Sequence, residues 1–155
     1  MDEREFTVPP RPPLPEASPA GIAPRGTRHI ARITLGIYAV ALTLIAIWPS
    51  PVDSGAGPLL RAITRVIPIL TYPRIEFGAN ILLFIPLGFL LALILTRRYL
   101  IVPIALVTTM AIESVQALML ERRTPSVMDI LANLTGACIG LLIVAGIEWW
   151  RRRDR

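Results

Sequence analysis

The sequence predicts an all-α, polytopic membrane protein built as a bundle of four transmembrane helices. Of its 155 residues, 54% are apolar and only 17% are charged, whereas a soluble domain is usually about 45–50% apolar and about 25% charged. The apolar residues fall in four blocks, each close to the roughly 20 residues that cross about 30 Å of hydrocarbon. This distribution indicates one membrane domain and argues against a pair of soluble domains.

The first 28 residues differ in composition from the rest of the chain. They contain seven prolines, charges of both signs and no sustained apolar periodicity, and such a segment buries too little apolar surface to offset the entropy of folding. We therefore expect residues 1–28 to be a disordered, proline-rich cytoplasmic tail. A cleaved signal peptide is the alternative, but no A-x-A site follows the first apolar run.

Four spans follow the tail, and each ends at residues that typically stop a membrane helix. The predicted spans are residues 30–48, 79–96, 100–120 and 126–150. Together they form one transmembrane domain over residues 29–150, and residues 151–155 form a basic cytoplasmic C-terminus. The interfacial aromatic belt accounts for Trp48, Trp149 and Trp150.

The arginines near the span ends predict the orientation. The chain has no lysine, and with the N-terminus inside nine of these arginines lie in the cytoplasm: Arg25, Arg28, Arg32, Arg97, Arg98, Arg151, Arg152, Arg153 and Arg155. Five lie outside: Arg61, Arg65, Arg74, Arg122 and Arg123. This asymmetry predicts a multi-pass protein of the plasma membrane with both termini cytoplasmic. Arginines at span ends do not form a basic face, so we expect no nucleic-acid partner.

An amphipathic segment lies in the first outer loop. Its apolar residues share one helical face: Leu59, Ile63, Val66, Ile67 and Leu70. Arg61 and Arg65 fall on the opposite face. This pattern is typical of a short helix lying in the membrane interface. Pro68 shortens it, and an ordinary surface loop is the alternative.

Polar residues form two stripes inside the third and fourth spans. At 100° per residue the members of each stripe fall within about 60° of one another. The third span carries Thr109, Glu113 and Gln116, and the fourth carries Asp129, Asn133, Gly136 and Gly140. Because polar groups in lipid are costly, such residues indicate a functional site by default.

The two stripes are expected to face each other. The turn 121–125 is short, so the third and fourth spans should form an antiparallel hairpin. Counting 1.5 Å per residue from the turn, Glu113 and Asn133 lie at similar depths, with Gln116 and Asp129 nearer the surface. We therefore expect one polar cluster in the outer leaflet.

A G-x-x-x-G pair, Gly136 and Gly140, accompanies this cluster. Small residues at this spacing let helices approach closely, so we expect a tight interface between the third and fourth spans. Pro86 in the second span lacks an N–H, removes one helical hydrogen bond and is expected to be a packing feature.

Each polar residue also has a purely structural interpretation. Ser126 and Asp129 have the spacing of a helix N-terminal capping pair. Glu113 is consistent with an interhelical hydrogen bond or ion pair, and Asn133 with a hydrogen bond between helices. These interpretations remain open beside a ligand site.

Taken together, these residues resemble the VanZ-like family, whose name-giver is associated with resistance to the glycopeptide antibiotic teicoplanin. The matching segments are, in order, Asn80 with Phe84-Ile85-Pro86-Leu87-Gly88, then Glu113-Ser114-Val115-Gln116, then Arg123, Ser126, Asp129, Asn133, Gly136 and Gly140. The family pattern is N-x-x-x-F-x-P-x-G, E-x-x-Q, an arginine, and D-x-x-x-N-x-x-G-x-x-x-G. The resemblance covers roughly residues 30–148. It implies a small cell-envelope protein without an established enzymatic activity.

Three functions are compatible with this sequence. The first is a non-enzymatic protein that binds an amphiphile, either a lipid-linked envelope precursor or a lipoglycopeptide, beside membrane lipid. Its ligand-binding candidates are Asn80, Glu113, Gln116, Arg123, Ser126, Asp129 and Asn133, and its helix-packing candidates are Pro86, Gly88, Gly136 and Gly140. The second is an accessory subunit whose polar stripe only packs helices. The third is an enzyme acting on a lipid-linked cell-wall intermediate, with Glu113 or Asp129 as acid or base.

Metal and cofactor chemistry is not expected from this composition. The chain has one cysteine, Cys138, in an apolar run, and one histidine, His29, in the tail region. No His/Cys group with metal-ligand spacing is present in the sequence. We therefore expect neither a metal site nor a cofactor.

Overall fold

The computed structural model describes residues 25–46, 66–67, 69, 71–119 and 126–154. Four long helices cover most of this part of the chain, and it contains no strand. They are α1 (Arg25–Ala46), α3 (Tyr72–Ile94), α4 (Ile101–Met119) and α5 (Val127–Arg153), with a short 3₁₀ turn, η2 (Arg98–Leu100), before α4. All four are long and apolar enough to span a membrane, which confirms the predicted all-α bundle of four candidate spans.

The interfacial helix expected in the first outer loop falls largely outside the described residues. Only Val66, Ile67 and Ile69 of that segment are described before α3, and all three side chains are exposed. The helix at residues 59–70 therefore stays a prediction. Of the tail predicted at residues 1–28, residues 1–24 lie outside the described part, whereas residues 25–28 form the first turn of α1 and are helical, which corrects the end of the predicted tail.

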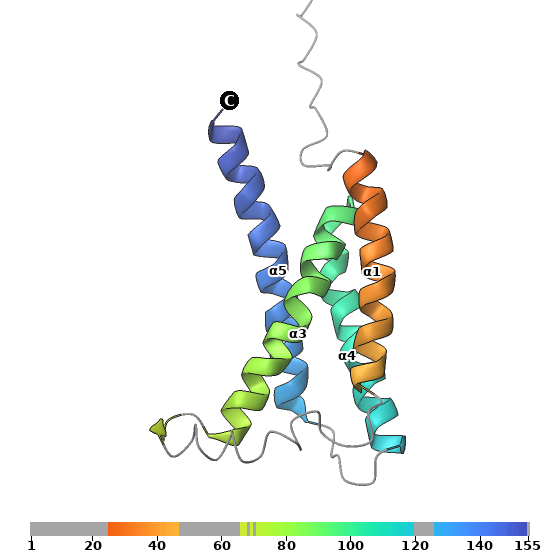
Figure 1. The fold of residues 1–155 in the computed structure, drawn as a ribbon, viewed down its shortest axis with the longest axis vertical. Helices are drawn as coiled ribbons and strands as arrows, with labels where there is room; N and C mark the ends of the chain where they lie inside the picture. Colours follow the sequence, from red (N-terminus) through yellow and green to blue (C-terminus); the bar gives the residue numbers. More distant parts are fainter. Residues whose placement is uncertain (1–24, 47–65, 68, 70, 120–125, 155) are drawn as a thin grey trace, which may run out of the picture.

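Successive helices alternate in direction (Figure 1). The start of α1, the connection between α3 and α4, and the end of α5 lie at one end of the bundle, which we call the terminal end. The end of α1, the start of α3, the end of α4 and the start of α5 lie at the opposite end, which we call the loop end. In consequence α3 and α5 run parallel, while α4 runs antiparallel to both.

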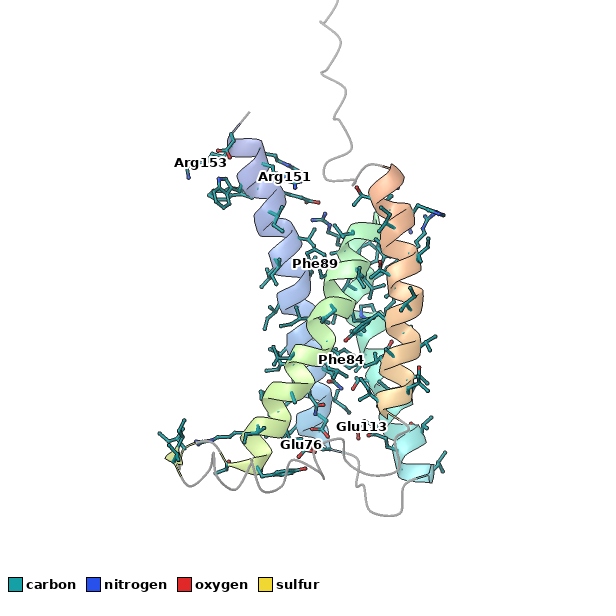
Figure 2. All side chains as sticks on the ribbon, viewed as in Figure 1. Glu76, Phe84, Phe89, Glu113, Arg151 and Arg153 are labelled. Carbon is teal, nitrogen blue, oxygen red and sulfur yellow. The ribbon has the colours of Figure 1, made fainter. Side chains whose placement is uncertain are left out.

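The charges divide unequally between these two ends. Seven described arginine side chains belong to the terminal end: Arg28, Arg32, Arg97, Arg98, Arg151, Arg152 and Arg153. Figure 2 shows Arg151 and Arg153 at that end, and Glu76 and Glu113 at the loop end. An ion pair, Arg98 with Glu148 at 2.5 Å, joins the α3–α4 connection to α5 at the terminal end.

The core is narrow, and the outer surface of the bundle is apolar. Phe84, Ile101 and Thr109 are the largest fully buried side chains among the described residues. In contrast, Ile37 on α1 and Val107 on α4 are each 68% exposed. A soluble protein rarely exposes apolar surface on every helix, so hydrocarbon is the solvent that suits this exterior.

The last helix is longer than a bilayer core requires. At 1.5 Å per residue, the 27 residues of α5 extend about 40 Å, against about 30 Å of hydrocarbon. Its final turns carry exposed Trp149 and Trp150 and the guanidinium of Arg153, which lies 5.7 Å from the centre of the Trp149 ring. Aromatic and arginine side chains are typical of the membrane interface.

Candidate functional site

The backbones of α3 and α5 are in direct contact. A Cβ atom added to Gly88 would lie 2.1 Å from the carbonyl oxygen of Ala137, and one added to Gly140 would lie 2.3 Å from that of Ile85. A Cβ on Gly136 would lie 2.2 Å from the carbonyl oxygen of Ile81. These distances leave no room for a side chain, so the two backbones touch only because glycine occupies these positions.

The expectation that Gly136 and Gly140 line the interface with the third predicted span is wrong. They face α3, the second span, and Gly88 of α3 meets α5 in return. The G-x-x-x-G spacing indicates a close approach without naming the neighbour. Polar groups, by contrast, join α4 to α5.

Hydrogen bonds between described residues connect α4 to the start and the first turns of α5. The backbone N–H of Ser126 donates to Oε2 of Glu113 at 3.1 Å, and Nδ2 of Asn133 donates to Oγ1 of Thr109 at 2.7 Å. Asn133 therefore pairs with Thr109, one helical turn from the expected partner Glu113, whose carboxylate instead reaches the N-terminus of α5 at Ser126. Figure 1 shows the reason, because α4 extends beyond the start of α5 at the loop end.

The start of α5 is capped in an unexpected way. Ser126 occupies the N-cap position, but its side chain makes no capping hydrogen bond. In a capping box, an acid three residues after the cap would accept a bond from the cap N–H. Here Glu113 of α4 accepts that bond, while Oδ1 of Asp129 accepts from Nδ2 of Asn80 on α3 at 2.8 Å. The interpretation of Ser126 and Asp129 as a capping pair does not hold, because their bonds go to two other helices.

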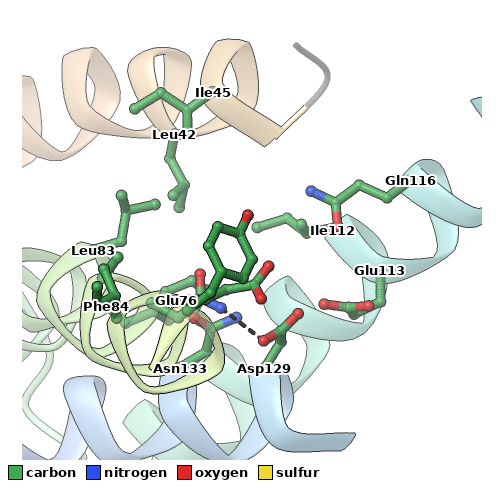
Figure 3. Close-up of a pocket in the computed structure, with 14 residues that line it drawn as sticks. Leu42, Ile45, Glu76, Leu83, Phe84, Ile112, Glu113, Gln116, Asp129 and Asn133 are labelled. Carbon is green, nitrogen blue, oxygen red and sulfur yellow. Dashed lines mark hydrogen bonds between the residues drawn. The ribbon is translucent and has the colours of Figure 1, made fainter. Parts of the chain in front are cut away.

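A pocket of about 360 Å³ opens where these contacts meet (Figure 3). All four long helices contribute to its lining: Leu42, Ile45, Tyr72, Ile75, Glu76, Ala79, Asn80, Leu83, Phe84, Ile112, Glu113, Gln116, Asp129 and Asn133. The side chains of α1 are apolar, whereas those of α5 are polar. Figure 3 shows the carboxylates of Glu113 and Asp129 pointing toward one another across the pocket.

Three polar members of this lining are well buried. Glu113, Gln116 and Asn133 are 7%, 8% and 4% exposed, and Asn80 and Asp129 are half-buried. The structure thus brings together five of the seven ligand-binding candidates. Ser126 is half-buried and bonds to Glu113 but does not line the pocket, and Arg123 lies outside the described residues.

The family model described as VanZ/LLP1 matches residues 35–149. The chain belongs to the VanZ/LLP1 family. Every residue that lines the pocket lies within the matched segment. No curated protein and no solved structure gives a significant match to the chain.

The VanZ/LLP1 motifs correspond to the contacts of α5 with its neighbours. In N-x-x-x-F-x-P-x-G, Asn80, Phe84 and Gly88 recur every four residues, which places them on one face of α3. Asn80 bonds to Asp129, and Gly88 touches Ala137. The second-span motif therefore holds α3 against α5, and the E-x-x-Q of α4 supplies Glu113 and Gln116 to the pocket.

Sequence reasoning missed Glu76 and Tyr72 in this VanZ/LLP1 pocket. The predicted second span begins at residue 79, whereas α3 begins at Tyr72. The sequence does contain a signal for this earlier start, because Pro73 lies in the first turn of the helix, where proline is favoured. Extending the helix back to this proline places Glu76 one turn before Asn80, on the same face.

Over the described ranges, no three His, Cys, Asp or Glu side chains are grouped so that they could hold a metal ion. Cys138 is a free cysteine, half-buried on α5. The polar groups that line the pocket are carboxyl groups, side-chain amides and the hydroxyl of Tyr72.

Proposed function

We propose that this VanZ/LLP1 membrane protein binds an amphiphilic molecule of the cell envelope in the pocket between its helices, without catalysing a reaction. The observation that supports this is a single cavity with an apolar wall from α1 and a polar floor from α5. Ligand sites of this kind combine apolar lining with a few convergent polar groups. An amphiphile matches both surfaces at once.

The ligand class follows from the family resemblance and from the size of the pocket. A lipid-linked cell-wall precursor or a glycopeptide or lipopeptide antibiotic is amphiphilic, and either would connect the protein to antibiotic or envelope-stress response. The pocket volume of about 360 Å³ is near the lower limit of about 300 Å³ for small-molecule sites. The pocket therefore takes the junction between tail and head, and the remainder of such a ligand stays outside.

A specific observation also favours the accessory-subunit alternative. The Asn80–Asp129 and Asn133–Thr109 bonds join helices, so part of the polar stripe packs the bundle whether or not a ligand binds. The two functions differ in one respect. A packing role requires no access to the pocket, whereas binding does.

Blocking the pocket should separate these functions. Ile45 lines the pocket from α1, and its neighbour Leu44 is 54% exposed and does not. We expect Ile45→Trp to weaken teicoplanin binding by about tenfold or more, equivalent to about 1.4 kcal/mol, while Leu44→Trp binds like the unaltered protein. Binding is measured by titration of the protein in nanodiscs.

Growth assays complete this test. In a strain lacking the protein, the unaltered chain and Leu44→Trp should restore teicoplanin tolerance, and Ile45→Trp should not, at equal amounts in the membrane fraction. Equal restoration by both tryptophan variants would leave the accessory role as the better account.

The same proposal places the terminal end of the bundle in the cytoplasm of a plasma-membrane protein. The seven described arginine side chains at that end, against Arg74 at the loop end, support this orientation by the positive-inside rule. The pocket then opens in the outer leaflet, where envelope precursors and extracellular drugs are found.

Cysteine labelling tests this orientation. In a Cys138→Ser background, a membrane-impermeant thiol reagent should label Ser54→Cys in intact cells and should label Asp2→Cys only after the membrane is permeabilised. Labelling of position 2 in intact cells would reverse the orientation and place the pocket on the cytoplasmic side.

A further inference from the structure

One buried acceptor in the pocket lining has no hydrogen bond within the described part of the chain. Asn133 is 4% exposed, and its Nδ2 donates to Thr109 Oγ1, while its Oδ1 has no partner. An unpaired buried polar atom carries the full cost of its lost hydration, so native proteins rarely keep one without a reason. Asn133 belongs to the pocket lining, and Figure 3 shows it beside Asp129 at the foot of the pocket. A ligand that donates a hydrogen bond there would supply what the protein does not.

Three carboxyl groups surround Asn133 in the pocket. Glu76, Glu113 and Asp129 also line the pocket. An ionised carboxylate only accepts hydrogen bonds, and it accepts roughly four. Ser126 donates to Glu113 and Asn80 donates to Asp129, so donors of the protein already serve these carboxyl groups, and Oδ1 of Asn133 is the acceptor offered to a ligand.

In a bilayer, the head of an amphiphile determines which ligand the pocket prefers. A lipid tail is already in an apolar medium, so moving it against Leu42 or Ile45 gains little, because the hydrophobic effect is absent there. Polar contacts then provide the discrimination between one amphiphile and another. A head that has no donor is disfavoured, because Oδ1 of Asn133 then stays buried and unpaired.

Taking the proposed amphiphile site as its basis, we infer that the pocket selects ligands by N–H or O–H donors near the tail junction, with Oδ1 of Asn133 as the deepest acceptor. Amine-bearing and hydroxyl-bearing amphiphiles share this chemistry. Quaternary ammonium heads, which carry the same charge as a protonated amine and no N–H, lack it.

The test compares heads on one chain length. The protein is placed in phosphatidylcholine nanodiscs, whose lipid head has no N–H or O–H donor, and titrated with dodecylamine, dodecyl glucoside or dodecyltrimethylammonium. Ligand affinity is obtained from the rise in thermal midpoint. We expect dodecylamine or dodecyl glucoside to bind at least about tenfold more tightly than dodecyltrimethylammonium, which is about 1.4 kcal/mol. Which of the two binds identifies an amine or a hydroxyl as the natural donor.

Two variants assign the effect to Asn133. Asn133→Asp keeps an acceptor at this position and should keep the preference for donors, whereas Asn133→Leu should remove it. The Asn133→Leu protein also controls for effects of each amphiphile on the bilayer. If that variant does not fold, the comparison of heads on the unaltered chain stands alone.

The outcomes separate this inference from the proposed function. Equal affinity for all three amphiphiles, blocked by Ile45→Trp, would overturn donor selection and leave amphiphile binding standing. An unchanged preference in Asn133→Leu would overturn the role of Asn133. Failure of every amphiphile to bind would overturn both proposals.

Discussion

Gly88→Ala is expected to prevent α3 from packing on α5, although it adds only one methyl group. That methyl carbon would lie 2.1 Å from the carbonyl oxygen of Ala137 and 2.7 Å from its carbonyl carbon and its Cα. All three are backbone atoms, which no rotamer change can move away. We expect a loss of more than about 3 kcal/mol of folding free energy, beyond the usual cost of overpacking a core, measured by denaturant titration in mixed micelles.

Gly146→Ala on α5 provides the matched control. A Cβ at Gly146 meets nothing within 4 Å, and alanine is favoured over glycine inside a helix by about 1 kcal/mol. This variant should be as stable as the unaltered protein or slightly more stable. If Gly88→Ala matched it in stability, the direct backbone contact between α3 and α5 would not exist in the membrane.

The four spans were predictable because span length depends on local composition. Runs of about 20 apolar residues with arginines at their ends predict where helices cross a bilayer, and each predicted span overlaps one of α1, α3, α4 and α5. The start of α3 was not predicted, because Pro73, Arg74 and Glu76 interrupt the apolar run there. A hydrophobic block indicates only the part of a helix that lies in lipid, and α3 begins before that part.

The neighbours of each stripe were harder to predict than the stripes themselves. The periodicity of Asp129, Asn133, Gly136 and Gly140 correctly places them on one face of α5, but that face spans two contacts. Its glycines meet α3, and Asn133 meets α4. A single-helix pattern defines a face, and the partner depends on how helices are arranged around it. Gly88 was the available clue, since a close approach needs small residues on both sides.

The register of α4 against α5 depended on the turn between them. Depth counting from residues 121–125 assumes that both helices end at the same level. α4 instead extends past the start of α5 (Figure 1), so that Asn133 pairs with Thr109, one turn from Glu113. A one-turn offset of this kind leaves no mark in the hydrophobic pattern of either helix.

Glu113→Ala is expected to destabilise the start of α5 and to disrupt the pocket, because Glu113 accepts the N–H of the α5 N-cap residue, Ser126. Glu113 is 7% exposed, so water cannot easily replace the lost acceptor. The N-terminus of a helix carries a partial positive charge that a nearby carboxylate stabilises. Hydrogen bonds to charged groups contribute about 1.5–3 kcal/mol, and we expect a loss of this size in the free energy of unfolding.

Two further variants separate the effect of the hydrogen bond from the effect of the charge and from that of a substitution elsewhere in the same turn of α4. Glu113→Gln keeps an acceptor oxygen of the same reach. Its free energy of unfolding should therefore exceed that of Glu113→Ala and fall below that of the unaltered protein only by the contribution of the charge. Ser114→Ala changes the next residue, whose exposed hydroxyl bonds to the carbonyl of Met110 within α4, and should remain within about 0.5 kcal/mol of the unaltered protein. Hydrogen exchange of the Ser126 amide gives a local readout, with faster exchange in Glu113→Ala alone. Slow exchange in that variant would mean that another group caps α5, and that Glu113 faces the pocket for its ligand only.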